Sequence, residues 1–341
     1  MKTKCTIVAA LVVSALALSA PIGAQNQAAV FDVLPVQGFN NTMVYMIVGA
    51  GGTVTAQIGE DGVLLVDTGT AENSDKLMAT IRRLTSKPIR YIINTHAHLD
   101  HAGGNDNILK AIGGQRTSQG GGGGGVENPE GPLMVTHQNT ANLMTDMGGD
   151  KPVYSDGAIP KSTFITRDKQ IYFNGEPIEL WWHGNGHTDG DIFVFFRRSD
   201  VISAGDFLQT DIYPAFDPEV GGGLQGILDG LNHLIALAVP RFNNIDGTRI
   251  IPGHGYLSNQ SDLAEVRDMA TIIRDRIQFM IGRNMTLAQV KAARPTFDFD
   301  PVFGSTTGAW TTDKFIDAVY AELKKPRTGP PPVSGLNFNA R

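Results

Sequence analysis

The feature that most constrains this chain is a run of ligand-type side chains directly after a short apolar strand. Residues 96–101 read His-Ala-His-Leu-Asp-His. Three imidazoles and a carboxylate so close together are costly to pack unless a cation compensates them. Alternate residues of an extended segment face the same side, so His96 and His98 are expected to bind one ion. Asp100 and His101 then point at a second ion nearby; a solvated polar loop is the alternative.

Three later positions repeat the pattern of a ligand-type residue beside glycine after an apolar strand. His187 follows a glycine-rich turn, Asp206 follows Gly205 after a strand, and His254 lies between Gly253 and Gly255. Glycine lets the backbone turn sharply and approach a site closely. Sites of α/β folds lie at the carboxyl ends of sheet strands. We therefore expect these residues to lie beside the first cluster.

The rest of the chain alternates expected strands and helices. Apolar and β-branched runs predict strands at 42–48, 53–58, 62–66, 91–93, 133–136, 170–173, 178–182, 191–197, 200–204 and 249–251. Helical spacing of apolar residues predicts helices at 73–86, 138–147, 224–235, 263–280, 285–293 and 313–324. Each half holds strands followed by helices, and no sharp linker separates the halves. This indicates one α/β domain in which two layers of sheet are flanked by helices.

Three segments are expected to stand apart from the domain proper, which spans 25–325. Residues 1–24 have two lysines before an uncharged apolar stretch, which is typical of a secretory signal peptide. The stretch is short for a membrane anchor, which is the alternative. Six consecutive glycines mark residues 113–131 as a flexible loop insertion. Residues 326–341 are rich in proline and glycine and are expected to form a flexible tail.

Composition limits the kinds of partner, the types of metal ligand and the compartment that we expect for this chain. The net charge is −6 and no block of lysine or arginine occurs, so we expect no nucleic-acid partner. The single cysteine, Cys5, falls in the expected signal peptide, so a metal site must use histidine and carboxylate. We expect a periplasmic or secreted protein, without stable membrane insertion after the signal peptide is cleaved.

Taken in order, these motifs resemble the metallo-β-lactamase superfamily. Asp67, the 96–101 cluster, His187, Asp206 and His254 follow one another as that family's motifs do. The resemblance implies an α/β fold, the αββα sandwich, with two mixed sheets flanked by helices. It also implies a site for two Zn²⁺ ions, and iron or manganese would also suit these ligands.

The resemblance assigns a role to each motif residue by position. The first ion would be bound by His96, His98 and His187, the second by Asp100, His101 and His254, and both by Asp206. Asp67 is expected to support catalysis without binding an ion itself, by holding a metal-binding side chain in place through a hydrogen bond.

The implied reaction is hydrolysis of a small molecule. Two cations about 3.5–4 Å apart share a water molecule, and zinc lowers the pKa of such a water to about 7. The resulting metal-bridging hydroxide would attack the carbonyl group of an ester, lactone, thioester or amide. Asp100 is expected to accept the nucleophile's proton and to aid the leaving group. Tyr213 and His183 are further candidates for substrate contact.

Other readings stay open at this point. β-Lactam hydrolysis suits a periplasmic location, although one β-lactamase subclass needs a cysteine ligand, which the mature chain would lack after removal of Cys5 with the signal peptide. Asp206 is instead similar to the bridging residue of glyoxalase II and lactonases. An iron-dependent sulfur dioxygenase and a non-catalytic binding protein are further alternatives. His137 is expected to cap or pack, and His233 to be structural.

Overall fold

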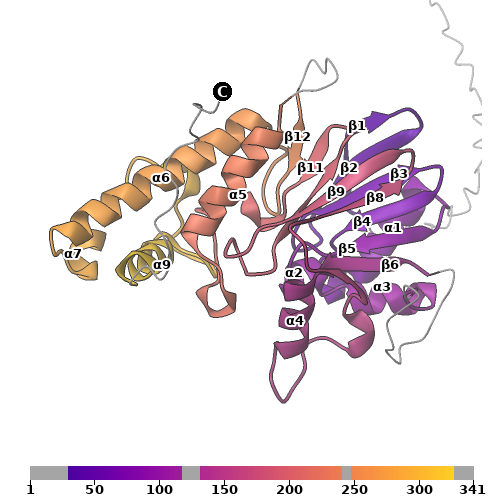
Figure 1. Cartoon of the computed structure of the whole chain (residues 1–341), viewed down its shortest axis with the longest axis horizontal. Coiled ribbons are helices and arrows are strands. Elements are labelled where there is room, and N and C mark those ends of the chain that lie inside the picture. The colour runs from indigo at the N-terminus through magenta and orange to yellow at the C-terminus, as the bar shows by residue number, and fades with distance from the viewer. Residues whose placement is uncertain (1–29, 117–130, 240–246, 326–341) are drawn as a thin grey trace, which may run out of the picture.

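The computed structural model describes residues 30–116, 131–239 and 247–325 (Figure 1). The expected signal peptide, most of the glycine-rich insertion and the expected tail lie outside the described residues, so the domain boundaries stay predictions. Within the described ranges, no helix has the length and apolarity needed to cross a bilayer.

Two mixed sheets form the centre of the fold. Among the described residues, the first sheet has seven strands in sequence order: β1 Asp32–Phe39, β2 Thr42–Val48, β3 Val54–Gly59, β4 Gly62–Val66, β5 Ile89–Ile93, β6 Leu133–His137 and β7 Ser162–Phe164. Strands β1 to β4 pair antiparallel, and β4 to β7 pair parallel.

The second sheet runs in the order β12-β11-β10-β9-β8. Its strands are β8 Asp168–Phe173, β9 Glu176–Trp182, β10 Ile192–Phe196, β11 Val201–Ser203 and β12 Arg249–Ile251. Only β11 and β12 pair parallel within this sheet's described strands. Both sheets are therefore mixed, as the sequence analysis expected.

Helices cover the outer face of each sheet (Figure 1). Their bounds are α1 Ser74–Leu84, α2 Leu99–Ala102, α3 Asn105–Ile112, α4 Gln138–Asp146, α5 Leu224–Leu237, α6 Gln260–Gly282, α7 Leu287–Ala292, α8 Asp300–Phe303 and α9 Thr312–Lys324. Apolar residues of α1 and α3 pack on the first sheet, and those of α5, α6 and α9 pack on the second. The expected αββα sandwich is thus confirmed.

Strand β10 illustrates how the sequence builds these layers. Its residues Ile192, Val194 and Phe196 lie in the core between the two sheets. The intervening Phe193 and Phe195 pack with the outer helices instead. Successive side chains of a strand point to opposite faces, so a strand covered on both faces must be apolar at every position. The continuous run Ile-Phe-Val-Phe-Phe is the result.

Several elements did not emerge from the sequence patterns: β1, α2, α3, β7 and α8. Strand β1 is an edge strand with an internal proline and no buried residue, so it lacks the apolar run of a central strand. Strand β7 has three residues and α2 and α8 have four each, which is too short for a periodic pattern.

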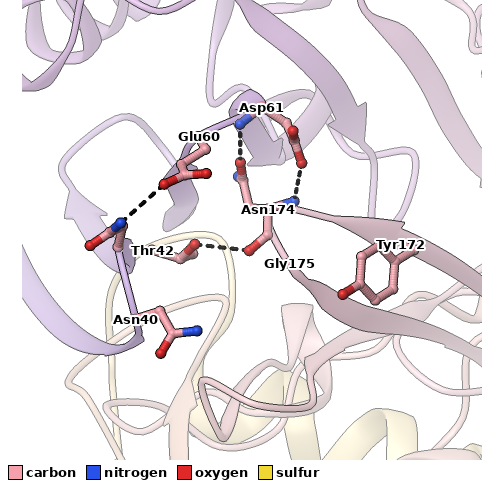
Figure 2. Close-up of a pocket in the computed structure, with 8 residues that line it drawn as sticks. Asn40, Thr42, Glu60, Asp61, Tyr172, Asn174 and Gly175 are labelled. Atoms are coloured by element: carbon pink, nitrogen blue, oxygen red, sulfur yellow. Dashed lines mark hydrogen bonds between the residues drawn. The ribbon is translucent and has the colours of Figure 1, made fainter.

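Hydrogen bonds join the two sheets at the amino end of β4, where turns from both sheets meet (Figure 2). The backbone N–H of Asn174 donates to Asp61 at 2.8 Å, and the N–H of Asp61 donates to Oδ1 of Asn174 at 2.9 Å. The Thr42 hydroxyl donates to the Asn174 carbonyl at 2.9 Å, and Asn174 Nδ2 donates to Gln57 at 3.1 Å. Thr42, Asp61 and Asn174 border a polar cavity of about 650 Å³ whose lining includes none of the predicted site residues.

Asn174 should therefore contribute more to stability than its conformation alone explains. Asn174 and Asn40 share a left-handed backbone, with φ of 51° and 53°. Asn174→Ala should lower the free energy of unfolding by about 2–4 kcal/mol, because buried partners lose their hydrogen bonds. The Asn40 side chain makes no hydrogen bond to the described residues, so Asn40→Ala should cost about 1 kcal/mol through backbone strain. Urea unfolding measures both, and equal losses would contradict this role.

Candidate metal centre

The residues expected as metal ligands come together at one edge of the sandwich. The 96–101 cluster follows β5 of the first sheet, and Asp206 and His254 follow β11 and β12 of the second. His187 lies in the loop between β9 and β10. The N–H of Thr53 donates to the Gly253 carbonyl at 2.8 Å and ties the two sheets together beside this edge.

Three groups of side chains hold candidate ligand atoms within 4.8 Å of one another. They are His96 with His98 and His187, His96 with His101 and Asp206, and Asp100 with His101 and His254. The first and third groups have the same members as the two ligand sets that the resemblance implied.

Asp206 lies between these two sets. Its Oδ1 is 3.0 Å from Nε2 of His101, and its Oδ2 is 3.4 Å from Nε2 of His187. Oδ2 is also 3.6 Å from Nε2 of His254. One carboxylate thus reaches residues of both ligand sets, which is the geometry that a bridging ligand requires.

Several ring nitrogens of the cluster face one another directly. Nδ1 of His98 lies 2.7 Å from Nε2 of His187, and Nε2 of His101 lies 3.3 Å from Nε2 of His254. Each facing pair can share one proton at most. A cation between the rings would accept both lone pairs, because neutral imidazole nitrogens are good ligands.

Asp67 lies outside the groups of candidate ligand atoms and orients His101. Its Oδ2 accepts a hydrogen bond from Nδ1 of His101 at 2.8 Å and from the Thr95 hydroxyl at 2.7 Å. Its Oδ1 accepts from the N–H of Thr95 at 2.8 Å. With its proton on Nδ1, His101 presents the lone pair of Nε2 to the cluster. Asp67 therefore fixes the orientation of a candidate ligand, as the sequence analysis expected of an outer carboxylate.

Two further partners come from the segment after β11. Nδ1 of His187 donates to the Ala215 carbonyl at 2.8 Å, which turns Nε2 toward the cluster. Gln209 donates to Oδ2 of Asp206 at 2.9 Å and accepts from the N–H of Ala215 at 2.7 Å. Sequence reasoning missed these residues. A backbone carbonyl leaves no mark in the sequence, and a glutamine three residues after Asp206 is a weak signal.

The cluster has the properties of a divalent cation site. Nε2 of His96 is buried and has no hydrogen-bond partner among the described residues. A Cβ on Gly52 would lie 2.3 Å from the His101 ring, and one on Gly253 would lie 1.9 Å from Asp206. Both backbones thus approach the ligands as closely as glycine allows. Imidazole and carboxylate donors suit zinc, and also iron or manganese. These residues therefore fit the two ions that the resemblance implies.

Within the cluster, the pKa shifts differ in direction. Burial alone would lower the pKa of His101, but Asp206 and Asp67 raise it well above its ordinary value, so a cation would displace a proton there. Burial, together with neighbouring histidines, lowers the pKa of His96 well below its ordinary value. Burial alone would raise the pKa of Asp206, but His101 and His187 hold it well below the usual range. A neutral imidazole and an ionised carboxylate are the forms that bind metal.

Tyr213 and His183, the candidates for substrate contact, lie outside the three ligand groups. Tyr213 is 1% exposed, stacks on Phe315 with ring centroids 4.8 Å apart, and donates its hydroxyl to Asp300. Nε2 of His183 lies 2.7 Å from Nδ1 of His233 in helix α5. Substrate contact by either residue stays a prediction, and the packing of Tyr213 gives it no support.

His137 and His233 have structural positions. Nδ1 of His137 accepts a hydrogen bond from the N–H of Asn139 and caps helix α4. His233 pairs with His183 and packs edge-on against Trp181. Neither belongs to a group that could hold a metal ion among the described residues.

Comparison with known proteins agrees with this geometry. A family model described as the metallo-beta-lactamase superfamily matches residues 47–254. A type 2 metallo-beta-lactamase from Bacillus cereus is 22% identical over 209 residues, which cover 61% of this chain and 68% of that relative.

Two solved structures show the same fold. A double mutant of the sec-alkyl sulfatase PisA1 superposes with a TM-score of 0.61 at 16% identity, over 86% of this chain. The matched region spans 50% of that sulfatase's length. The DIM-1 metallo-beta-lactamase gives a TM-score of 0.50 at 16% identity, over 70% of this chain and 97% of its own.

The pairing of His183 with His233 predicts a loss of stability in acid. Burial, together with His233 and Arg167, lowers the pKa of His183 to about 4. An unfolded histidine titrates near about 6.5, so the unfolded chain binds more protons between these values. Stability is therefore full above about pH 6.5 and falls as the pH drops toward about 4.

His183→Gln should reduce this acid sensitivity. In metal-free protein, the loss of unfolding free energy from pH 7 to pH 5 should be smaller in the variant by about 1 kcal/mol, after allowance for the partial exposure of the ring. Urea unfolding at the two pH values measures the difference. Equal losses of unfolding free energy in the wild type and in His183→Gln would contradict the predicted role of His183 in acid sensitivity.

Proposed function

Because this chain belongs to the metallo-beta-lactamase superfamily, we propose that it is a dinuclear zinc hydrolase. Its substrate is a small molecule with an ester, lactone, thioester or amide carbonyl. One observation carries the proposal: Asp206 lies between two groups of metal-type ligands from both sheets. The relatives named as β-lactamases and as a sulfatase are hydrolases, which supports the reaction type.

Each side chain has a role in this proposal. His96, His98 and His187 hold the first ion, Asp100, His101 and His254 hold the second, and Asp206 binds both. Bound there, two divalent cations supply an activated water nucleophile and polarise the carbonyl under attack. Asp67 keeps His101 in the tautomer that leaves Nε2 free.

Asp100 is placed to move a proton. Its Oδ2 lies 3.2 Å from Nε2 of His254, and its side chain is 40% exposed. Burial alone would raise the pKa of Asp100, but the hydrogen bond from His254 and the charge of His101 lower it. An ionised carboxylate at the open side of the cluster can accept the proton of the attacking water and pass it to the leaving group.

The proposal also covers the compartment and the partners. We place the enzyme in the periplasm or outside the cell, because its first residues have the pattern of a signal peptide. Its partner is a small-molecule substrate. The net charge of −6 supports the absence of a nucleic-acid partner.

Two other substrate classes have specific support. The similarity to the Bacillus cereus enzyme favours β-lactams, which also contain an amide carbonyl. The likeness to the sec-alkyl sulfatase concerns the fold, and sulfate esters belong in the same set of trial substrates. An iron-dependent oxidation is separated from all of these by the identity of the bound metal.

The zinc-loaded protein should contain about two zinc ions per chain by elemental analysis. His96→Ala and Asp206→Ala should lower the zinc content and reduce hydrolysis by at least about 100-fold, since loss of an outer partner alone costs about 10- to 100-fold. His183→Gln, which removes an imidazole outside the cluster, should keep both ions. Iron with oxygen uptake would support the dioxygenase instead, and a metal-free wild type would refute the metal centre.

A substrate panel tests the carbonyl class. Aryl esters, lactones, thioesters and β-lactams should be hydrolysed faster than sulfate or phosphate esters. A chelator should abolish the activity and added zinc should restore it, because the nucleophile needs the cation. Hydrolysis of sulfate esters alone would contradict the carbonyl class and leave the metal centre standing.

A further inference from the structure

The segment between β11 and α5 holds several candidate ligands in place, and Asp217 is part of it. Oδ2 of Asp217 lies 3.4 Å from Nε2 of His98. The same segment supplies the Ala215 carbonyl to His187 and Gln209 to Asp206. Within the first ligand group, the Ala215 carbonyl orients His187, the Thr95 hydroxyl lies 3.0 Å from Nδ1 of His96, and Asp217 is the outer group that faces His98.

The position of the Asp217 carboxylate is fixed by its own hydrogen bonds. Oδ1 accepts from the N–H of Glu219 at 2.9 Å and caps a short turn of helix. The backbone N–H donates to the His187 carbonyl at 2.8 Å, and the carbonyl accepts from Gly222 at 2.7 Å. With the backbone and Oδ1 held, Oδ2 is directed toward His98.

The segment also packs against the carboxyl-terminal region of the chain. Phe216 is 2% exposed and packs edge-on against Trp310, with ring centroids 5.7 Å apart. Tyr213 stacks on Phe315 of helix α9. Both contacts come from beyond residue 254, where the family match ends. These two aromatic contacts therefore restrain the segment that carries Asp217.

The two nitrogens of His98 have different surroundings. Nδ1 faces Nε2 of His187 at 2.7 Å, inside the first ligand group, and Nε2 faces Asp217. A neutral imidazole carries one proton. For Nδ1 to offer its lone pair to a cation, the proton must be on Nε2, where a carboxylate stabilises it.

We propose that Asp217 is a positioning residue that holds the proton of His98 on Nε2 and aims Nδ1 at the first ion. This role rests on the proposed metal centre. An outer carboxylate on a metal-bound histidine fixes the ring and raises its basicity, and its removal costs about 10- to 100-fold in metal affinity. Asp217 would complete a set in which Ala215 orients His187 and Asp67 orients His101.

The variant Asp217→Asn separates this role from the cap. Asparagine is as good a helix cap as aspartate, so its Oδ1 can still accept from Glu219. Its amide nitrogen then faces His98 as a donor and cannot receive the proton of Nε2. Asp211→Asn is the matched control, because it removes the same charge from an exposed position of the same segment.

Two measurements read out the effect without a substrate. Competition with a chromophoric chelator should show the tighter-bound zinc weakened about 10-fold or more in Asp217→Asn and unchanged in Asp211→Asn. Nitrogen-15 NMR of the histidine rings in zinc-loaded protein should show His98 protonated on Nε2 in the wild type. In Asp217→Asn, the proton of the His98 ring should exchange between the two nitrogens, or the nitrogen-15 signals of that ring should shift. Asp217→Glu, which restores a carboxylate, should recover part of the affinity.

The outcomes distinguish this role from the proposed function. Wild-type protein that binds no zinc would refute the metal centre and the role of Asp217 with it. Zinc affinity in Asp217→Asn within twofold of Asp211→Asn, with the His98 signal unchanged, would overturn the positioning role alone. Should Asp217→Asn fail to fold, as judged by urea unfolding, the Asp217→Glu variant decides: affinity as low as that of the metal-site variant His96→Ala would contradict the proposal.

Discussion

The structure depends on bringing buried imidazoles and carboxylates from two sheets into contact at one edge. Nδ1 of His98 lies 2.7 Å from Nε2 of His187, which in turn lies 3.4 Å from Oδ2 of Asp206, and Nε2 of His96 is buried without a hydrogen-bond partner among the described residues. In a medium of low polarity such an arrangement is costly unless a cation compensates it. In the proposed metal centre, the free energy of metal binding would also be free energy of folding for these segments, because the unfolded chain has no preformed site.

The two sheets reach this edge because the core between them is apolar on both sides. Strands β4, β5 and β10 to β12 contribute side chains to one shared cluster, so their ends are held in register with one another. A closely packed interior transmits small displacements, which makes the positions of the ligands sensitive to the whole sandwich. Ligands on strand ends are therefore held more precisely than ligands on free loops would be.

A second layer of contacts decides which way each ring points. Asp67 and Thr95 act on His101 from the first sheet, while the segment from Gln209 to Asp217 acts on Asp206, His187 and His98. That segment packs against the aromatic side chains of Trp310 and Phe315 in the carboxyl-terminal region. Helices beyond the family match thus contribute to the site through packing, and the sequence patterns gave no sign of this link. Tyr213, whose contact with substrate stays a prediction, takes part in this packing.

The mixed sheets followed from the family resemblance, whereas the sequence by itself determined the candidate ligand residues and most element positions. Those properties are written in local patterns: ligand-type residues after apolar strands, alternation in strands, and apolar spacing in helices. Only the tertiary structure decided the contacts of Asp206 with both groups, the partners of each imidazole and the burial of Tyr213. Those depend on which segments meet in space, and residues as distant in sequence as Asp67 and His101, or His98 and Asp217, carry no local signal of their pairing. The edge strand β1 was missed for a related reason, since it is defined by its pairing with β2 rather than by an apolar run of its own.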